Sequence, residues 1–171
     1  MAGELEEVRS FVPEPENARL LRDAFGRFAT GVAIVTVAGP EGPVAITVNS
    51  FSSVSLDPPL VLWSPDRRSR RFPHFEAAEH FAVHILEAGQ GELCWKVVKD
   101  AYALSGLGLL PNSHGVPVIP HVLARFDCRR EAVYEGGDHA IILGRVEQAE
   151  LRETGDALAF FRGQVGRFLS A

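Results

Sequence analysis

The stretch from Val44 to Pro59, VAITVNSFSSVSLDPP, places a polar run between two apolar segments. Its first residues alternate between apolar and polar, which is typical of a half-buried strand. A serine-rich run follows, and the apolar segment Leu60–Trp63 after it favours a second strand. Hydroxyls and amides cost free energy when they are buried without hydrogen-bond partners. We therefore expect a hydroxyl-rich turn that connects two core strands.

Two interpretations of this turn follow from its composition. A ligand rich in acceptors, such as a ribityl phosphate, would satisfy the hydroxyls, the amide and the exposed backbone N–H groups in a neutral cradle. Serine, asparagine and aspartate also favour surface turns for purely local reasons. Composition leaves both interpretations open.

Length and charge limit the class of protein. A chain of 171 residues is long enough for one domain with a full core, which we expect over residues 15–171. The residues before it are acidic and aperiodic, so we expect a mobile N-terminal arm over residues 1–14. The formal net charge of −5 argues against a nucleic-acid partner. Charged residues, proline and glycine interrupt every apolar run, so no membrane span is expected.

The N-terminus and the cysteines indicate the cellular compartment in which the protein is expected. The first eight residues are acidic and lack the basic-then-apolar order of a signal peptide. Cys94 and Cys128 form neither a disulfide framework nor a metal-ligand spacing, and we expect both to be small buried hydrophobes. A cytoplasmic location is therefore the expectation.

The remaining pattern favours a mainly β fold with peripheral helices. Helical spacing predicts helices over residues 15–29, 73–79 and 91–99, with Gly31 just beyond the first. Strands are predicted over residues 31–38, 44–49, 60–64, 81–86, 125–134 and 139–149. The long segment 100–120 suggests a lid or an interface loop, and Phe160 begins a C-terminal tail. Strands do not alternate with helices, and no G-x-G-x-x-G follows a strand, so an antiparallel barrel is favoured over a doubly wound sheet.

Several segments, in order, resemble one family. FATGVAIVT at residues 28–36 and TVNSFSSVSLDPP at residues 47–59 are similar to the short-chain flavin reductases, the reductase components of two-component flavin monooxygenases. Arg68-Ser69-Arg70, residues 81–86 and Gly136-Gly137-Asp138-His139 extend the resemblance, which spans residues 20–162. It implies an antiparallel split β-barrel of the FMN-binding type, FMN or FAD as the flavin, NADH or NADPH as the hydride donor, and a homodimer.

The resemblance also implies a set of flavin-binding residues. Thr30 and Val32 would lie near the ring system, and Thr47, Val48 and Asn49 would face its edge. The implied ribityl and phosphate contacts are Ser50, Ser52, Ser53, Ser69 and Arg70. Trp63 and Ser64 occupy positions where relatives often have smaller or acidic residues, so this side of the site is expected to differ. Trp63 is either a core aromatic or a residue that stacks on the ligand.

The basic turn after the second strand has two interpretations. Arg67, Arg68, Arg70 and Arg71 surround Ser69. Such a run is usually a solvated surface, but a guanidinium directly after the polar stretch also suits a phosphate or pyrophosphate.

His139 is the candidate on the nicotinamide side. It follows a Gly-Gly turn at the start of a long strand, and the resemblance implies contact with the nicotinamide; a locally hydrogen-bonded turn histidine is the alternative. Arg162 could reach the same pocket. Relatives often have Tyr three residues after this arginine, where this chain has Val165.

No metal site is expected, because His74, Glu76, Glu79 and His80 have none of the usual ligand spacings. Hydride transfer between two cofactors needs orientation rather than a nucleophile, which agrees with the lack of a catalytic triad motif. The leading hypothesis is an NAD(P)H-dependent flavin reductase that supplies reduced flavin to a monooxygenase. The alternatives are a non-catalytic flavin carrier or sensor, and a flavoprotein reductase with a non-flavin acceptor such as a corrinoid or a ferric chelate.

Overall fold

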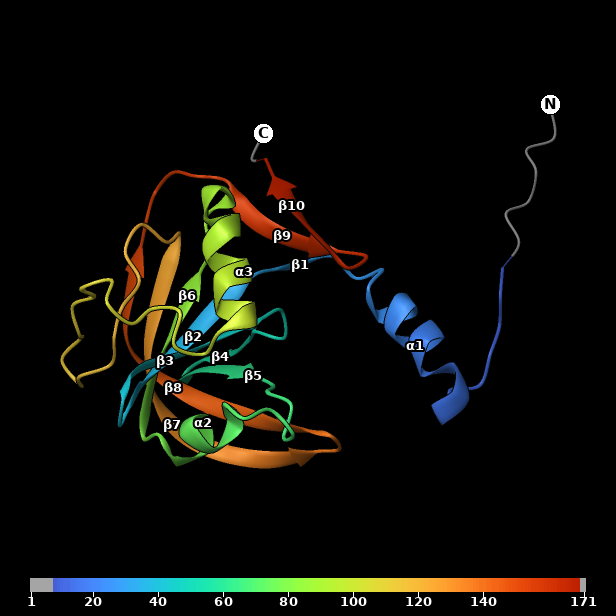
Figure 1. Ribbon diagram of the computed structural model, residues 1–171, viewed down its shortest axis with the longest axis horizontal. Helices are drawn as coiled ribbons and strands as arrows, with labels where there is room; N and C mark the ends of the chain where they lie inside the picture. Colours follow the sequence, from blue (N-terminus) through green and yellow to red (C-terminus); the bar gives the residue numbers. More distant parts are fainter. Residues whose placement is uncertain (1–7, 170–171) are drawn as a thin grey trace.

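Two antiparallel sheets form the body of the protein (Figure 1). The structure is a computed structural model that describes residues 8–169. The larger sheet has seven strands in the order β3-β2-β6-β7-β8-β5-β4, and the smaller has three in the order β1-β9-β10. The prediction of a mainly β, antiparallel fold with peripheral helices is confirmed. Of the expected N-terminal arm, residues 1–7 lie outside the described residues, and residues 8–14 form no helix or strand.

The bounds of the elements are as follows. The strands are β1 (Thr30–Gly31), β2 (Ala33–Gly39), β3 (Gly42–Val48), β4 (Ser52–Leu56), β5 (Pro59–Trp63), β6 (His80–Ile85), β7 (Ala124–Gly136), β8 (His139–Leu151), β9 (Ala157–Phe161) and β10 (Gln164–Phe168). The helices are α1 (Ala18–Phe25), α2 (Phe72–Ala77) and α3 (Gly91–Lys99), with 3₁₀ turns at Pro15–Asn17 and Ala88–Gln90. Among the described residues, no helix combines the length and the apolar character needed to cross a membrane.

Strand β2 is almost wholly apolar, and residues 33–37 are buried because both of its faces are covered there. Val35 and Val37 pack in one buried cluster with Trp63 and Ile142. Ile34, whose side chain points to the opposite face, packs in a second cluster with residues of α3 and of the segment 100–120. The neighbouring strands pair with β2 in an antiparallel register, with Val35 opposite Ile46 on β3 and opposite Val83 on β6.

The segment 100–120 covers the second cluster instead of extending into solvent. Leu104, Val116 and Ile119 are buried. The Thr36 hydroxyl donates to the Pro117 carbonyl oxygen at 2.7 Å, and the Ala45 N–H donates to the Ala101 carbonyl oxygen at 2.9 Å. These contacts anchor the segment to β2 and β3.

The N-terminal helix is shorter than the predicted span 15–29. The Asn17 side chain accepts from the Glu14 N–H and donates to the Val12 carbonyl oxygen, so these bonds fix the chain just before α1. The helix ends at Phe25, not near Gly31, because glycine is a poor helix former and the N–H of Gly26 caps the last turn by donating to the Arg22 carbonyl oxygen. Gly31 instead belongs to strand β1.

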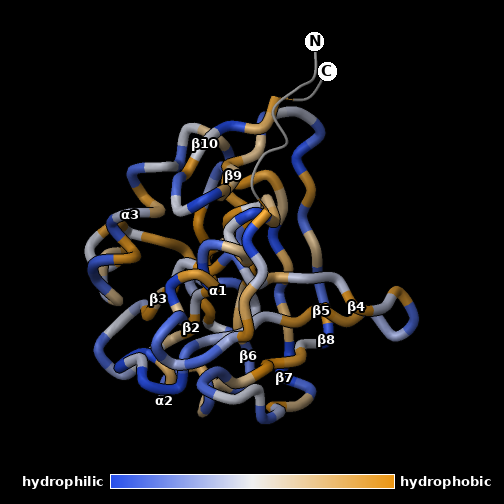
Figure 2. Tube along the Cα trace, turned by 90° about the vertical axis from the view of Figure 1, so that its right-hand side faces the viewer, coloured by the Kyte–Doolittle hydropathy of each residue, from blue (hydrophilic) through white to orange (hydrophobic). Residues whose placement is uncertain are grey.

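The serine-rich run is a strand, which corrects the prediction of a turn. Residues Ser52–Leu56 form β4 at the edge of the large sheet, paired with β5. The reversal occurs at Asp57 and Pro58, and this hairpin projects from the body (Figure 2). Hydroxyl side chains fit an edge strand well because one face of it remains in water.

The C-terminal segment is a hairpin, which corrects the prediction of a tail. Strands β9 and β10 pair around Arg162 and Gly163, which have φ values of 51° and 81°. Two successive residues with positive φ give the turn geometry that matches strand twist. Arginine in the first of these positions is a weak turn signal, so the sequence pattern did not reveal the hairpin.

Replacing Gly144 by Ala is expected to lower the free energy of unfolding by about 1–3 kcal/mol, because a Cβ there would overpack the core. That atom would overlap Cζ of Phe81 and lie 3.2 Å from Cβ of Cys128. Gly166→Ala on β10 is the matched control, since a Cβ added at that position would have no heavy atom within 4 Å. Chemical denaturation measures both variants, and equal stabilities would contradict the packing described here.

Candidate functional site

An open hollow of about 950 Å³ lies between α1, the end of β3 and the β9–β10 turn. Figure 1 shows α1 standing beside the body, next to the end of β9. Three residues predicted to bind flavin or nicotinamide line this hollow, namely Thr30, Asn49 and Arg162. Phe160 on β9 forms part of the same wall. The small sheet therefore brings together residues that are more than 100 positions apart in the chain.

A second hollow of about 150 Å³ adjoins the first, and the two share Asn49 and Phe160. Val32, Thr47 and Val48 line it, as predicted for the ring end of the ligand. The other lining residues come from α3 and β10 and are Cys94, Trp95, Val98 and Val165. Val165, the position at which the resemblance implies a tyrosine, thus borders the predicted ring site.

Two threonine hydroxyls differ in how they are satisfied. The Thr47 hydroxyl donates to the Cys94 carbonyl oxygen at 3.0 Å, so it connects β3 to α3. The Thr30 hydroxyl oxygen is buried and has no hydrogen-bond partner among the described residues. A buried hydroxyl without a partner costs free energy. Thr30 therefore carries the unpartnered hydroxyl beside this hollow, and a ligand would reach its oxygen only after a small movement of the residues that cover it.

The predicted serines fall into two groups. Ser50 and Ser64 bind each other, since the Ser50 hydroxyl oxygen accepts from the Ser64 N–H at 2.9 Å and the hydroxyl donates to the Ser64 carbonyl oxygen at 3.3 Å. Ser52 and Ser53 are exposed on β4, and the Ser52 hydroxyl donates to the Ser53 carbonyl oxygen. The structure thus places the second pair on the outer strand, whereas the first pair joins the ends of β3 and β5.

Trp63 is a core residue. Its side chain is fully buried, with ring centroids 5.2 Å from Phe75 and 6.0 Å from Phe81 in edge-to-face arrangements. This position corrects its inclusion among the flavin-binding residues, because a buried ring surrounded by two aromatic rings has no free face for a ligand. Cys94 and Cys128 are buried free thiols, as expected, and burial raises the pKa of each.

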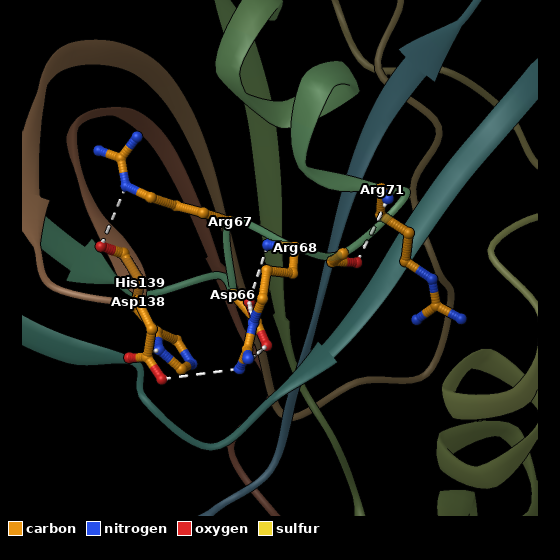
Figure 3. A network of polar contacts seen from close by, with 7 residues as sticks. Asp66, Arg67, Arg68, Arg71, Asp138 and His139 are labelled. Carbon is orange, nitrogen blue, oxygen red and sulfur yellow. Dashed lines mark hydrogen bonds and ion pairs between the residues drawn. The ribbon is translucent and has the colours of Figure 1, made fainter.

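His139 lies in a polar corner where β8 begins (Figure 3). Its Nδ1 is 2.8 Å from Oδ1 of Asp138, and its side chain is 43% exposed. An isolated β-bridge joins His139 to Asp66, which follows β5. The hydrogen bond from His139 lowers the pKa of Asp138, so this carboxylate stays charged and orients the imidazole.

The basic turn is partly neutralised by its neighbours. Arg67 contacts Glu135 at 2.8 Å, and Arg68 contacts Asp66 at 3.4 Å. The Arg71 side chain points away from this corner (Figure 3) and donates to the Val98 carbonyl oxygen at 2.9 Å. Arg70 is exposed and forms no ion pair within residues 8–169. Arg70 is therefore free to contact an external phosphate without first breaking an ion pair.

The corner and the hollows are linked through the backbone. Asn49 borders both hollows, and the next residue, Ser50, is hydrogen-bonded to Ser64. Asp66, two residues after Ser64, pairs with His139. The contacts of Ser50 with Ser64 and of Asp66 with His139 therefore connect the predicted flavin residues to the predicted nicotinamide residue.

Sequence reasoning missed the contribution of the small sheet. Phe160, Trp95 and the residues of α1 that line the larger hollow were not among the predicted site residues. Phe160 lies opposite Thr30 across β1 and β9, a long-range pairing. The sequence signal that could have placed Phe160 beside Thr30 is the turn of the β9–β10 hairpin.

Comparisons with known proteins agree with this arrangement. A model of the flavin reductase like domain matches residues 25–168. The FMN reductase (NADH) SmoA of Agrobacterium fabrum is 53% identical over 158 residues, which cover 92% of this chain and 90% of that protein. The reductase subunit HsaB of a flavin-dependent monooxygenase from Rhodococcus jostii is 36% identical, covering 88% and 78%.

Solved structures give the same result. The NADH:FAD oxidoreductase SgcE6 of Streptomyces globisporus superimposes with a TM-score of 0.87 at 34% identity, covering 95% of this chain and 99% of that one. The same protein has also been solved in complex with NAD and FAD fragments, with a TM-score of 0.85 and coverage of 94% and 98%. The predicted split-barrel fold is thereby confirmed, and the chain belongs to the flavin reductase-like family.

Proposed function

We propose that this protein is an NADH- or NADPH-dependent flavin reductase that passes reduced FMN or FAD to a partner oxygenase. The observation that carries the proposal is the convergence of Thr30, Val32, Thr47, Val48 and Asn49 on two adjoining hollows in a chain of this family. Relatives named as NADH-dependent flavin reductases and as monooxygenase reductase subunits support the donor, the flavin and the oxygenase partner.

The residues around the hollows fit a flavin. The unpartnered Thr30 hydroxyl can exchange a hydrogen bond with a polar edge of the ring system. Val32, Phe160 and Val165 provide apolar walls for its faces. Ligand sites commonly combine apolar walls with a few placed polar groups in volumes of about 300–1,000 Å³, a range that includes the larger hollow.

The contribution of the chain to the reaction is orientation. When bound, the flavin and the nicotinamide supply the hydride chemistry themselves. Val48 and Asn49 position the ring edge, and the apolar wall excludes water from it. Asp138 fixes the imidazole of His139, which we place against the nicotinamide. Ser50, Ser64, Ser69 and Arg70 are proposed for the ribityl and phosphate end, and Ser52, Ser53 and Arg162 for its periphery.

Thr30→Val is expected to raise the flavin Kd about tenfold without loss of stability. Valine is close to threonine in shape, and the change removes a hydroxyl that has no partner among the described residues. Flavin fluorescence titration measures the first effect, and thermal unfolding measures the second. Thr47→Val is the matched control, because its hydroxyl bonds Cys94 and its loss should cost about 1 kcal/mol of stability. A Thr30→Val protein that loses stability but keeps its flavin affinity contradicts the assignment.

His139→Asn is expected to lower kcat/KM for NADH about tenfold while leaving the flavin Kd unchanged. The change would remove the imidazole that we place against the nicotinamide. His139 lies beside Asp138 and lines neither hollow, so the flavin contacts would stay intact. His121→Asn, an exposed histidine of another loop, serves as the control. If the flavin Kd rose by the same factor by which kcat/KM for NADH fell, His139 would contact the flavin instead.

The test of the function is oxidation of NADH and of NADPH by the purified protein with increasing FMN or FAD. Turnover that rises with free flavin supports a reductase with a diffusible flavin substrate. Tight flavin binding without turnover selects the carrier or sensor alternative. Turnover that needs a corrinoid or ferric chelate while flavin stays bound selects the third alternative.

We also propose a homodimer. None of the residues of α1 is buried, and Phe25 and Phe28 beside the larger hollow are 69% and 77% exposed. Apolar patches of this kind mark interaction surfaces. A second copy that packs against α1 would cover these rings and narrow the hollow. Sedimentation equilibrium would give twice the chain mass, and a monomer would contradict the proposal. The cytoplasmic location expected from the acidic N-terminus stays a prediction.

A further inference from the structure

Three side chains that are far apart in the sequence meet on the surface of the large sheet. They are His80 at the start of β6, His114 in the segment 100–120 and Glu147 on β8. One ligand atom from each lies within 4.8 Å of the others. Nε2 of His114 is 3.1 Å from Oε2 of Glu147, and Nε2 of His80 is 3.7 Å from the same oxygen.

The local backbone directs Glu147 toward the two imidazoles. On β8, Val146 pairs with Cys128 and Gln148 pairs with Asp127, so Glu147 is the extra residue of a β-bulge. Such bulges redirect a side chain. Arg129 holds the other carboxylate oxygen of Glu147 at 3.4 Å, which leaves Oε2 on the side of the histidines. The charge of Arg129 is shared with Glu131 at 3.9 Å.

His114 is held by a tight turn. The Asn112 Oδ1 accepts from the N–H groups of His114 and Val116, both at 3.0 Å. The Asn112 N–H donates to the Val116 carbonyl oxygen at 2.8 Å, which closes the turn. The imidazole of His114 stacks on that of His80 with centroids 3.9 Å apart and planes at 7°. Three separate elements thus bring the three side chains together.

We propose that His80, His114 and Glu147 bind one divalent transition-metal ion of the Zn²⁺ type. Two imidazole nitrogens and one carboxylate oxygen form a ligand set that Zn²⁺ uses where water fills the fourth position. The three side chains are between 21% and 37% exposed, so the ion can enter from solvent. The two rings are parallel in the structure, so binding of one ion by both Nε2 atoms would require the His114 side chain to rotate.

The cluster shares no residue with the proposed flavin site, because none of its three residues lines either hollow. It is also distant from His139, since Glu147 and His139 are eight residues apart on β8, which is about 26 Å along an extended strand. A bound ion would cross-link the segment 100–120 to β6 and β8. That segment covers the second core cluster, so the bound ion should raise the stability of the folded protein. It should not change hydride transfer.

The experiment uses the full chain without an affinity tag, freed of metal by EDTA and dialysis. Zn²⁺ titration by calorimetry should give one site per chain, and Co²⁺ should give the visible absorption bands of a four-coordinate ion. Saturating Zn²⁺ should raise the Tm by about 5 °C or more. His114→Asn should weaken Zn²⁺ binding by at least about 100-fold, since loss of a direct ligand exceeds the 10–100-fold cost of losing a supporting group.

The control is His121→Asn, which makes the same chemical change at an exposed histidine near the end of the same segment. It should bind Zn²⁺ as the unmodified chain does. Glu147→Gln provides a second ligand variant if His114→Asn does not fold. No Zn²⁺ binding, or equal binding by the unmodified chain and by both ligand variants, would overturn the proposal. Flavin reductase activity is a separate readout, and its absence would not affect this result.

Discussion

Replacing Asn49 by Trp is expected to raise the flavin Kd at least about 100-fold, equivalent to about 2.7 kcal/mol, and to lower turnover at limiting flavin by the same factor. Asn49 borders both hollows directly after the end of β3. Its side chain is exposed, so the protein can fold around the larger residue. The indole would then occupy the space that we assign to the flavin ring.

Two further variants separate blockage from other effects of the tryptophan. Glu41→Trp places the same side chain in the exposed turn between β2 and β3, at the opposite end of the strand, and should leave flavin affinity unchanged. Asn49→Ala keeps the hollows open and should weaken binding much less than Asn49→Trp. Flavin fluorescence titration and NADH oxidation measure all three. An Asn49→Trp protein whose Kd stays close to that of the unmodified chain would contradict the site.

The second large effect is a loss of stability below neutral pH that originates at His84. Its side chain is fully buried on β6, with Nδ1 3.1 Å from the Ile34 carbonyl oxygen and Nε2 without a partner among the described residues. Burial is the main cause that lowers the pKa of His84 to about 4, and the nearby Arg125 adds to the lowering. The folded protein thus favours the neutral imidazole.

The sign of the pH dependence follows from proton uptake by the unfolded chain. An unfolded histidine, with its pKa near 6.5, binds a proton as the pH falls below that value, whereas folded His84 stays neutral until about pH 4. Between pH 7 and pH 4 this difference should remove about 3 kcal/mol from the free energy of unfolding. Below pH 4 both states are protonated and the loss levels off.

Urea denaturation at pH 7, 5.5 and 4.5 measures the effect, with His84→Gln as the comparison. Glutamine can still donate to the Ile34 carbonyl oxygen but does not titrate. Other groups titrate equally in both proteins, so the difference between the two pH profiles isolates His84. Parallel profiles for the two proteins would show that His84 has an ordinary pKa in the folded state.

The local sequence pattern was sufficient to predict elements that are marked by residue spacing or by a turn signal. The helix Gly91–Lys99 and the hairpin of β7 and β8 agree with the predictions, the hairpin turn being marked by Gly137 with its φ of 74°. The serine run was wrongly predicted as a turn because hydroxyl residues suit both turns and exposed edge strands.

Long-range contacts account for what the sequence could not reveal. Thr30 meets Phe160 across the small sheet, and β9 ends in a turn whose arginine is an uncommon residue at positive φ. Trp63 is a core residue because Phe75 and Phe81 surround it, which no local pattern indicates. His80 was considered with its sequence neighbours, whereas the fold places it beside His114 and Glu147.

A crystal structure of the protein grown with FMN would locate the flavin. We expect the flavin ring in contact with Asn49 and Phe160, with the Thr30 hydroxyl within hydrogen-bond distance of a polar ring atom. Flavin bound only elsewhere, such as at the corner of Arg67 and His139, with the two hollows empty, would contradict the proposed flavin site.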